Sequence, residues 1–297
     1  MAQRSFFMKE RSKILAGQLV LCPLLFILAL TMFLPFIYIF MVSFTDAGAY
    51  QSGKLILWPE KWSVEAYQFI LSGGGFIKSL RATLFITLVG TPLNVIFNSG
   101  VAYMLSKNTL PGRSIINKLI MFTMLFSPGM IPTYLNMMNL GLLNSWWACI
   151  LPGLCGAWTV MVMKSFFQNI PKELEEAASI DGSGDLKTFL LIILPLSKAM
   201  LATFTLFAAV SYWNTYFSAI MYISKSSMQP LQVFLQQVVM SVNYTEYMDV
   251  SLEAATTLPQ EIVKMACIII AVLPIMCVYP FLQKYFAQGV MVGSVKG

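Results

Sequence analysis

The chain of 297 residues contains no histidine and few charged residues. Without histidine, the chain lacks the commonest general acid–base group near neutral pH and the commonest metal ligand. Charged residues make up 11% of the chain, whereas soluble globular proteins carry about 25%. Hydrophobic residues make up 58%. This composition excludes a soluble enzyme, a nucleic-acid-binding domain and a disordered scaffold, and it predicts a protein whose main solvent is lipid.

The chain also lacks the cysteine patterns of disulfide or metal sites. Its five cysteines are odd in number, form no CxxC pair and lie in or beside apolar runs. They are Cys22, Cys149, Cys155, Cys267 and Cys277. We expect them to pack as small hydrophobic side chains, and we expect no metal site and no cofactor in this chain.

Six apolar stretches are long enough to cross a membrane. They are Ile14–Phe44, Ile77–Leu105, Ile115–Met138, Trp146–Phe167, Met200–Ile223 and Met265–Phe286. Each reaches the ~20 residues that span a ~30 Å hydrocarbon layer as a helix. Lipid offers no partners for backbone groups, so helices are expected rather than open strands. The predicted fold is an all-α membrane protein with six transmembrane helices.

Basic residues are distributed unevenly between the segments that join these stretches. With the N-terminus in the cytoplasm, thirteen of the 19 basic residues fall in cytoplasmic segments and the other six in outer segments. This asymmetry predicts that both termini are cytoplasmic. The predicted organisation is a cytoplasmic segment 1–13, a transmembrane domain 14–286 with outer loops 45–76 and 224–264 and a cytoplasmic loop 168–198, and a cytoplasmic tail 287–297.

The cytoplasmic loop 168–198 carries five of the 13 acidic residues. Pro171 suits the first turn of a helix, and the glutamates after it lie near the positive helix end. Gly182 can adopt the left-handed conformation that ends a helix. Asp185 is placed to cap a second short helix that runs towards Pro195. The sequence therefore predicts two short helices joined by a glycine turn. Composition alone fits a solvated linker equally well.

This loop resembles the EAA loop of permease subunits from binding-protein-dependent ABC importers. The positions that carry the resemblance are Glu176, Ala177, Ala178, Asp181, Gly182, Phe189, Leu194 and Pro195. Its place between the fourth and fifth of six spans is similar to the carbohydrate branch, whose familiar members are the maltose permease subunits. The segment from Tyr212 to Ala219 resembles an aromatic segment of that branch. Ser183 stands where the family usually has alanine, which leaves the helix–glycine–helix geometry intact.

The resemblance implies that the EAA positions contact a cytoplasmic ATPase subunit and pass its movement to the spans. It also implies that the tail reaches the ATPase dimer through Gly293, Val295, Lys296 and Gly297. The expected partners are a second homologous permease, two ATPase subunits, an extracytoplasmic solute-binding protein, membrane lipid and a saccharide, with no nucleic acid. The chain has no G-x4-GK[ST] loop, so it is not expected to be the ATPase. ATP and Mg would bind the partner ATPase subunits. The implied location is the bacterial cytoplasmic (inner) membrane, with several spans.

Aromatic and amide side chains within the spans are candidates for a saccharide pathway. They are Asn94, Asn98, Tyr134, Asn136, Trp158, Tyr212, Trp213, Asn214 and Tyr216. Each could equally form a helix–helix contact or lie at the membrane interface. The tail and the fifth stretch resemble most the branch that handles complex or acidic saccharides, alginate-type polymers included.

Two alternatives belong to other functional classes. An ion-coupled secondary transporter would usually carry carboxylates within its spans, and the six stretches contain no Asp or Glu. A membrane-embedded enzyme would need acid–base groups, and the chain has neither histidine nor an acidic pair within its spans. The sequence therefore favours a non-catalytic permease subunit.

Overall fold

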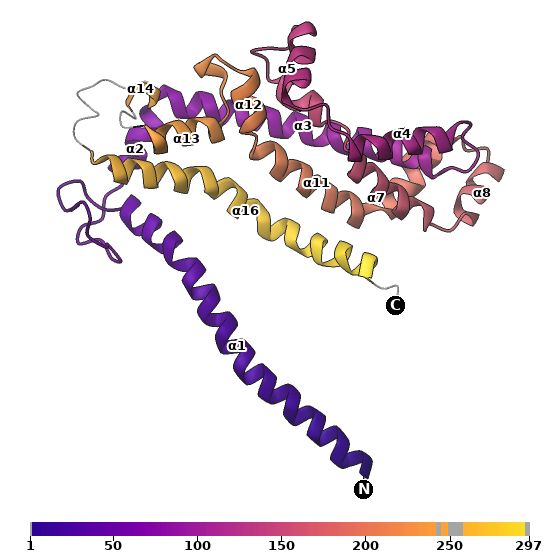
Figure 1. The fold of residues 1–297 in the computed structure, drawn as a ribbon, viewed down its shortest axis with the longest axis horizontal. Helices are drawn as coiled ribbons and strands as arrows, with labels where there is room; N and C mark the ends of the chain where they lie inside the picture. Colours follow the sequence, from indigo (N-terminus) through magenta and orange to yellow (C-terminus); the bar gives the residue numbers. More distant parts are fainter. Residues whose placement is uncertain (1, 242–244, 249–257, 295–297) are drawn as a thin grey trace. The chain divides into compact units, whose positions relative to one another are not determined.

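The computed structural model describes residues 2–241, 245–248 and 258–294, and these residues are almost entirely helical (Figure 1). The elements are α1 (Ala2–Ser43), α2 (Glu65–Ser72), α3 (Gly74–Ser106), α4 (Arg113–Leu125), α5 (Met130–Asn139), α6 (Trp147–Ile150), η1 (Leu151–Gly153), α7 (Ala157–Gln168), α8 (Glu173–Ile180), α9 (Asp185–Thr188), η2 (Phe189–Ile193), α10 (Leu194–Leu196), α11 (Lys198–Trp213), α12 (Phe217–Tyr222), η3 (Ser226–Met228), α13 (Leu231–Met240), α14 (Thr245–Met248) and α16 (Gln260–Ser294). Within the described residues, extended pairing is limited to an isolated bridge between Thr45 and Trp62.

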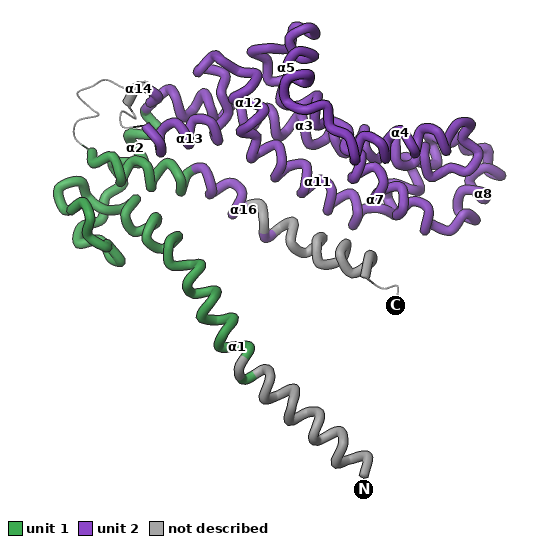
Figure 2. The backbone as a smooth tube through the Cα atoms, viewed as in Figure 1, with its two compact units in different colours: residues 1–72, 250–270 green, residues 73–249, 271–297 purple. Residues whose placement is uncertain are grey.

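The chain forms two compact units, coloured separately in Figure 2. The first comprises residues 1–72 and 250–270. Here the end of α1 contacts α2 through Ser43, whose hydroxyl lies 2.7 Å from the Tyr67 hydroxyl. An ion pair of 3.0 Å between Lys61 and Asp46 closes the loop between the two helices. The apolar side chains of α1 are exposed from Leu21 to Phe36, as expected of a helix surrounded by lipid or by another membrane subunit.

The second unit comprises residues 73–249 and 271–297 and is built around α3. This helix of 33 residues is about 50 Å long at 1.5 Å per residue, and it packs along α7 and α11 (Figure 1). Gly90 permits a close approach, because a Cβ atom there would lie 3.0 Å from the Tyr212 ring. One apolar cluster surrounds Ile86 and Ile150 near this contact, and a second surrounds Tyr103 and other aromatic rings.

Three helical segments are long and apolar enough to cross a membrane singly: Leu21–Ser43, Gly74–Ser106 and Gln260–Cys277. Three further pairs of helices reach this length only as bent pairs, so the described residues give three to six candidate spans. The first, second and sixth predicted stretches correspond to α1, α3 and α16. Each of the remaining three predicted stretches is interrupted in the structure.

Two of these breaks have a local cause. The third stretch bends by 117° between α4 and α5, where Pro128 disfavours a helical residue before it and Gly129 has φ +84°. The fourth bends by 50° between Gly153 and Ala157, after the proline of η1. The fifth is helical in α11 up to Trp213 and again in α12 from Phe217; the N-terminal end of α11 meets the segment 185–196 at a bend of 85°.

Candidate functional site

The predicted helix–glycine–helix segment is present in the second unit. Helix α8 ends in a paired turn, in which Gly182 N–H donates to the Ser179 carbonyl and Ser183 N–H donates to the Ala178 carbonyl, at 3.0 and 2.9 Å. Gly182 has φ +77°, the left-handed conformation that this helix ending requires. Gly184, with an extended backbone, precedes α9 and is its N-cap. The prediction that Asp185 would cap α9 is therefore wrong by one residue, and Asp185 is the first helical residue instead.

The arm after the glycine turn is anchored by aromatic packing. Phe189 is buried, and its ring stacks on that of Tyr103 in α3 with centroids 4.7 Å apart. It also meets the edge of Phe167 in α7 at 6.2 Å. Leu194 packs against the same cluster, whereas Pro195 is exposed. Two of the positions that carry the EAA resemblance thus fix the arm to α3 and α7.

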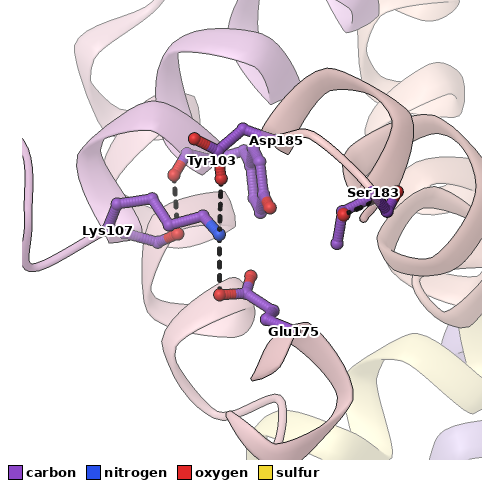
Figure 3. A network of polar contacts seen from close by, with 7 residues as sticks. Tyr103, Lys107, Glu175, Ser183 and Asp185 are labelled. Atoms are coloured by element: carbon purple, nitrogen blue, oxygen red, sulfur yellow. Dashed lines mark hydrogen bonds and ion pairs between the residues drawn. The ribbon is translucent and has the colours of Figure 1, made fainter. Parts of the chain in front are cut away.

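A polar network joins α8 to the end of α3 (Figure 3). Lys107, the residue directly after α3, donates to Glu175 Oε2 at 2.7 Å. The same ammonium lies 3.4 Å from Asp185 Oδ1 and 4.7 Å from the centre of the Tyr103 ring. Burial alone would lower the pKa of Lys107, but the bonds to Glu175 and the contact with Tyr103 outweigh it and hold that pKa above its ordinary value. Lys107 is therefore a fixed positive charge between the two arms of the loop.

Exposed apolar side chains flank the glycine turn. Ile180 is 87% exposed and Leu186 is 71% exposed, on either side of the Gly182 turn. Glu176, Ala177 and Asp181 are also exposed, whereas Ala178 faces inward and is buried. Within this unit the turn therefore presents two large apolar side chains next to carboxylates, a surface suited to a protein partner.

Three of the predicted pathway residues lie together, at the break between Gly153 and Ala157. Asn98 is fully buried; its amide donates to the Leu154 carbonyl and its oxygen accepts from Gly156 N–H, both at 3.0 Å. Asn94 donates to the Gly153 carbonyl at 2.8 Å. Tyr212 donates its hydroxyl to the Ile150 carbonyl at 3.2 Å. These side chains satisfy backbone groups that the broken helix leaves free.

The other pathway candidates are scattered. Tyr134 stacks parallel to Tyr222 at 6.4 Å, and Asn214 accepts from the Gln232 amide at 3.0 Å. The remaining ones are Asn136 and Trp158, which are exposed, Tyr216, which is half-buried, and Trp213, which is buried. Of the predicted tail contacts, Gly293 lies in α16, while Val295, Lys296 and Gly297 lie outside the described residues.

Two residues that join distant segments of this unit were not identified from the sequence. Lys107 contributed there only to the charge asymmetry, because nothing local links it to a carboxylate 68 positions away. Asn144 has φ 55°, and its side-chain oxygen accepts from the N–H groups of Ser224 and Lys225 at 2.8 and 3.1 Å. The Asn-Ser pair in a short turn was an available signal, since asparagine tolerates this conformation.

Comparison with known proteins agrees with this architecture. The family model described as "Binding-protein-dependent transport system inner membrane component" matches residues 23–292. The polygalacturonan/rhamnogalacturonan transport system permease protein YtcP of Bacillus subtilis (strain 168) is 45% identical over 92% of this chain and 96% of its own. Protein LplC of the same organism is 43% identical over 89% of both chains.

A solved structure is also similar. It is a chain of a bacterial ABC transporter involved in the import of the acidic polysaccharide alginate, with a TM-score of 0.83 and 36% identity over 90% of this chain and 95% of that one. The match of the family model over nearly the whole length, together with the apolar helices and the relatives' sequences, identifies this chain as a member of the family of inner membrane components of binding-protein-dependent transport systems.

Proposed function

We propose that this chain is the transmembrane subunit of an ATP-driven importer for an oligosaccharide or polysaccharide of acidic character. Support for the substrate class comes from the relatives: one is named for polygalacturonan and rhamnogalacturonan, and the solved importer for alginate. The chain would form half of the translocation pathway, and a second homologous permease the other half. A solute-binding protein would deliver the saccharide from outside the membrane.

The proposed role of the loop 168–198 is to couple the permease to two ATPase subunits, which carry ATP and Mg. The observation that carries this proposal is the bent segment α8–Gly182–α9, with an exposed tip on one side and anchors to α3 on the other. An ATPase that closes on ATP binds one arrangement of this segment better, and that difference in affinity shifts the equilibrium of the spans. For this role the loop and both termini would lie in the cytoplasm.

The proposed pathway passes along α11, where Trp213 supports a saccharide contact. Its side chain is buried, and its indole N–H has no hydrogen-bond partner among the described residues. A buried donor without a partner costs about 1–3 kcal/mol. A saccharide hydroxyl or the second permease would satisfy it. Asn94, Asn98 and Tyr212 would instead act by holding the broken helix beside this pathway.

The test is assembly and transport of the importer. The chain is expressed with its second permease, ATPase subunits and binding protein, and the purified complex is placed in proteoliposomes. Ile180→Asp and Leu186→Asp put a charge on the exposed tip without disturbing the core, and we expect them to abolish co-purification of the ATPase. Leu55→Asp is the matched control, because Leu55 is equally exposed at 71% but lies in the loop after α1. Uptake by this chain alone, driven by an ion gradient, would overturn the proposal and favour a secondary transporter.

A further inference from the structure

The bent segment α8–Gly182–α9, here called the coupling segment, is packed unevenly against the rest of the unit, and α8 contributes little to this packing. Of the residues of α8, only Ala178 is buried. A pocket of about 520 Å³ separates α8 from the end of α3; Ser106, Lys107, Glu175 and Ser179 are among the residues that line it. Close packing therefore does not connect these two helices along this pocket. If α8 is displaced, a contact other than close packing must transmit that displacement directly to α3.

That contact is the pair of interactions from Lys107 to Glu175 and Asp185, here called the Lys107 bridge (Figure 3). Its two carboxylates come from α8 and α9, so one ammonium touches both arms of the bent segment. The Lys107 and Glu175 side chains are only 21% and 27% exposed. A partly shielded pair with a hydrogen bond of 2.7 Å is stronger and more directional than an exposed ion pair.

Because Lys107 directly follows α3, the bridge connects α8 to α3. The coupling segment is covalently continuous with α7 and, through a bend of 85°, with α11. Phe189 already stacks on Tyr103 of α3 after α9, and the Lys107 bridge adds a polar connection from α8 itself to α3, which is remote in sequence and lies at the centre of the unit. Further along α3, Asn98 holds the break between Gly153 and Ala157. A push on α8 through Lys107 would therefore act on the helix that positions this break.

On this basis we propose that Lys107 is a positioning residue for transport, which transfers the displacement of the coupling segment to α3. This inference rests on the proposed function, since it specifies how that segment would act. Lys107 would touch neither ATP nor the saccharide. Without the bridge, α8 would still meet the ATPase through its exposed tip, but its movement would reach α3 less completely. The loss would appear as ATP hydrolysis that is not matched by uptake.

The experiment uses the assembled importer in proteoliposomes and measures saccharide uptake per ATP hydrolysed. We expect Lys107→Gln to leave ATPase co-purification and the thermal midpoint of the complex close to wild type, and to lower this ratio by roughly fivefold, the lower end of allosteric couplings. Lys118→Gln is the matched control, because Lys118 is an exposed lysine in the first half of α4. Its ratio should stay at the wild-type value.

Exchanging the charges of Lys107 and Glu175 tests whether the ion pair itself is required or only a lysine at position 107. Lys107→Glu alone would bring three carboxylates together, and Glu175→Lys alone would place two ammonium groups side by side, so both should lower the ratio. The double variant restores an opposite pair and should recover most of it. An unchanged ratio in Lys107→Gln, or a loss of assembly with no change in the ratio, would overturn the inference. Failure of the wild-type chain to co-purify with an ATPase would instead overturn the proposed function.

Discussion

Asn98 in α3 bonds to Gly156 in the break of the fourth predicted span, and the Gly156 N–H donates to the Asn98 side-chain oxygen at 3.0 Å. The Asn98 amide group at the same time donates to the Leu154 carbonyl and to the carbonyl of Asn94, one turn earlier in α3. One buried side chain thus satisfies groups on both sides of an interrupted helix. Irregular backbone at membrane depth is tolerated where it is buried in protein and satisfied in this way.

Replacing Asn98 by alanine should therefore destabilise the complex. It leaves the Gly156 N–H and the Leu154 carbonyl without their partner, which we expect to cost on the order of 2 kcal/mol in total, given the modest strength of hydrogen bonds within membranes. Thermal unfolding of the purified complex in detergent measures the change. Asn94→Ala removes the bond to the Gly153 carbonyl and the bond that the Asn94 oxygen accepts from the Asn98 amide. It should cost less, because the Asn98 amide keeps its bonds to the Asn94 and Leu154 carbonyls. A wild-type midpoint for Asn98→Ala would show that other contacts hold the break.

Gly182 and Gly184 provide a matched pair in the coupling segment. A Cβ atom would meet nothing within 4 Å at either position, but only Gly182 has a positive φ, at +77°. Gly182→Ala should therefore cost about 1 kcal/mol of backbone strain and loosen the turn, whereas Gly184→Ala should have little effect. Gly182→Asn should be better tolerated than alanine.

Hydrogen exchange of the segment 173–188 in the assembled importer tests this prediction. Faster exchange and reduced uptake are expected for Gly182→Ala and not for Gly184→Ala. Equal behaviour of the two alanine variants would show that the left-handed turn is not what orders the segment.

The sequence predicted the fold and the local turn better than it predicted the contacts between distant residues. The apolar stretches predicted the helical membrane fold because burial in lipid constrains twenty residues at a time, and the glycine in EAASIDG predicted the α8–α9 turn because its cause is local. The breaks at Pro128 and after Pro152 had visible signals, yet their angles depend on packing. The ion pair between Lys107 and Glu175 could not be predicted from the sequence, because only the tertiary structure brings the end of α3 next to α8.

The pH dependence of the Lys107 bridge has a defined sign. Burial alone would lower the pKa of Lys107, but the bond to Glu175 and the contact with Tyr103 outweigh it and raise that pKa above its ordinary value of 10.5. A raised lysine pKa in the folded state contributes stability below the unfolded pKa, and that contribution is lost as pH rises through the folded value. Lys107 should therefore remain charged from about pH 6 to about pH 9. The difference in uptake per ATP between wild type and Lys107→Gln should be constant over this range, and a difference that vanishes towards about pH 9 would contradict the assigned charge.

Two glycines within α3 distinguish helix packing from helix propensity. A Cβ atom on Gly90 would lie 3.0 Å from the Tyr212 ring, whereas one on Gly100 would meet nothing within 4 Å. Gly90→Ala should therefore push α11 away from α3 and lower the thermal midpoint of the complex. The cost should reach about 1–3 kcal/mol, as for other overpacked sites. Gly100→Ala should be neutral or stabilise α3 by up to about 1 kcal/mol, because alanine favours the helix. If both variants unfold at the same temperature, the contact between Gly90 and Tyr212 does not limit the approach of these helices. If Gly90→Ala alone is destabilised and adding Tyr212→Leu restores its thermal midpoint, the tyrosine ring is the cause.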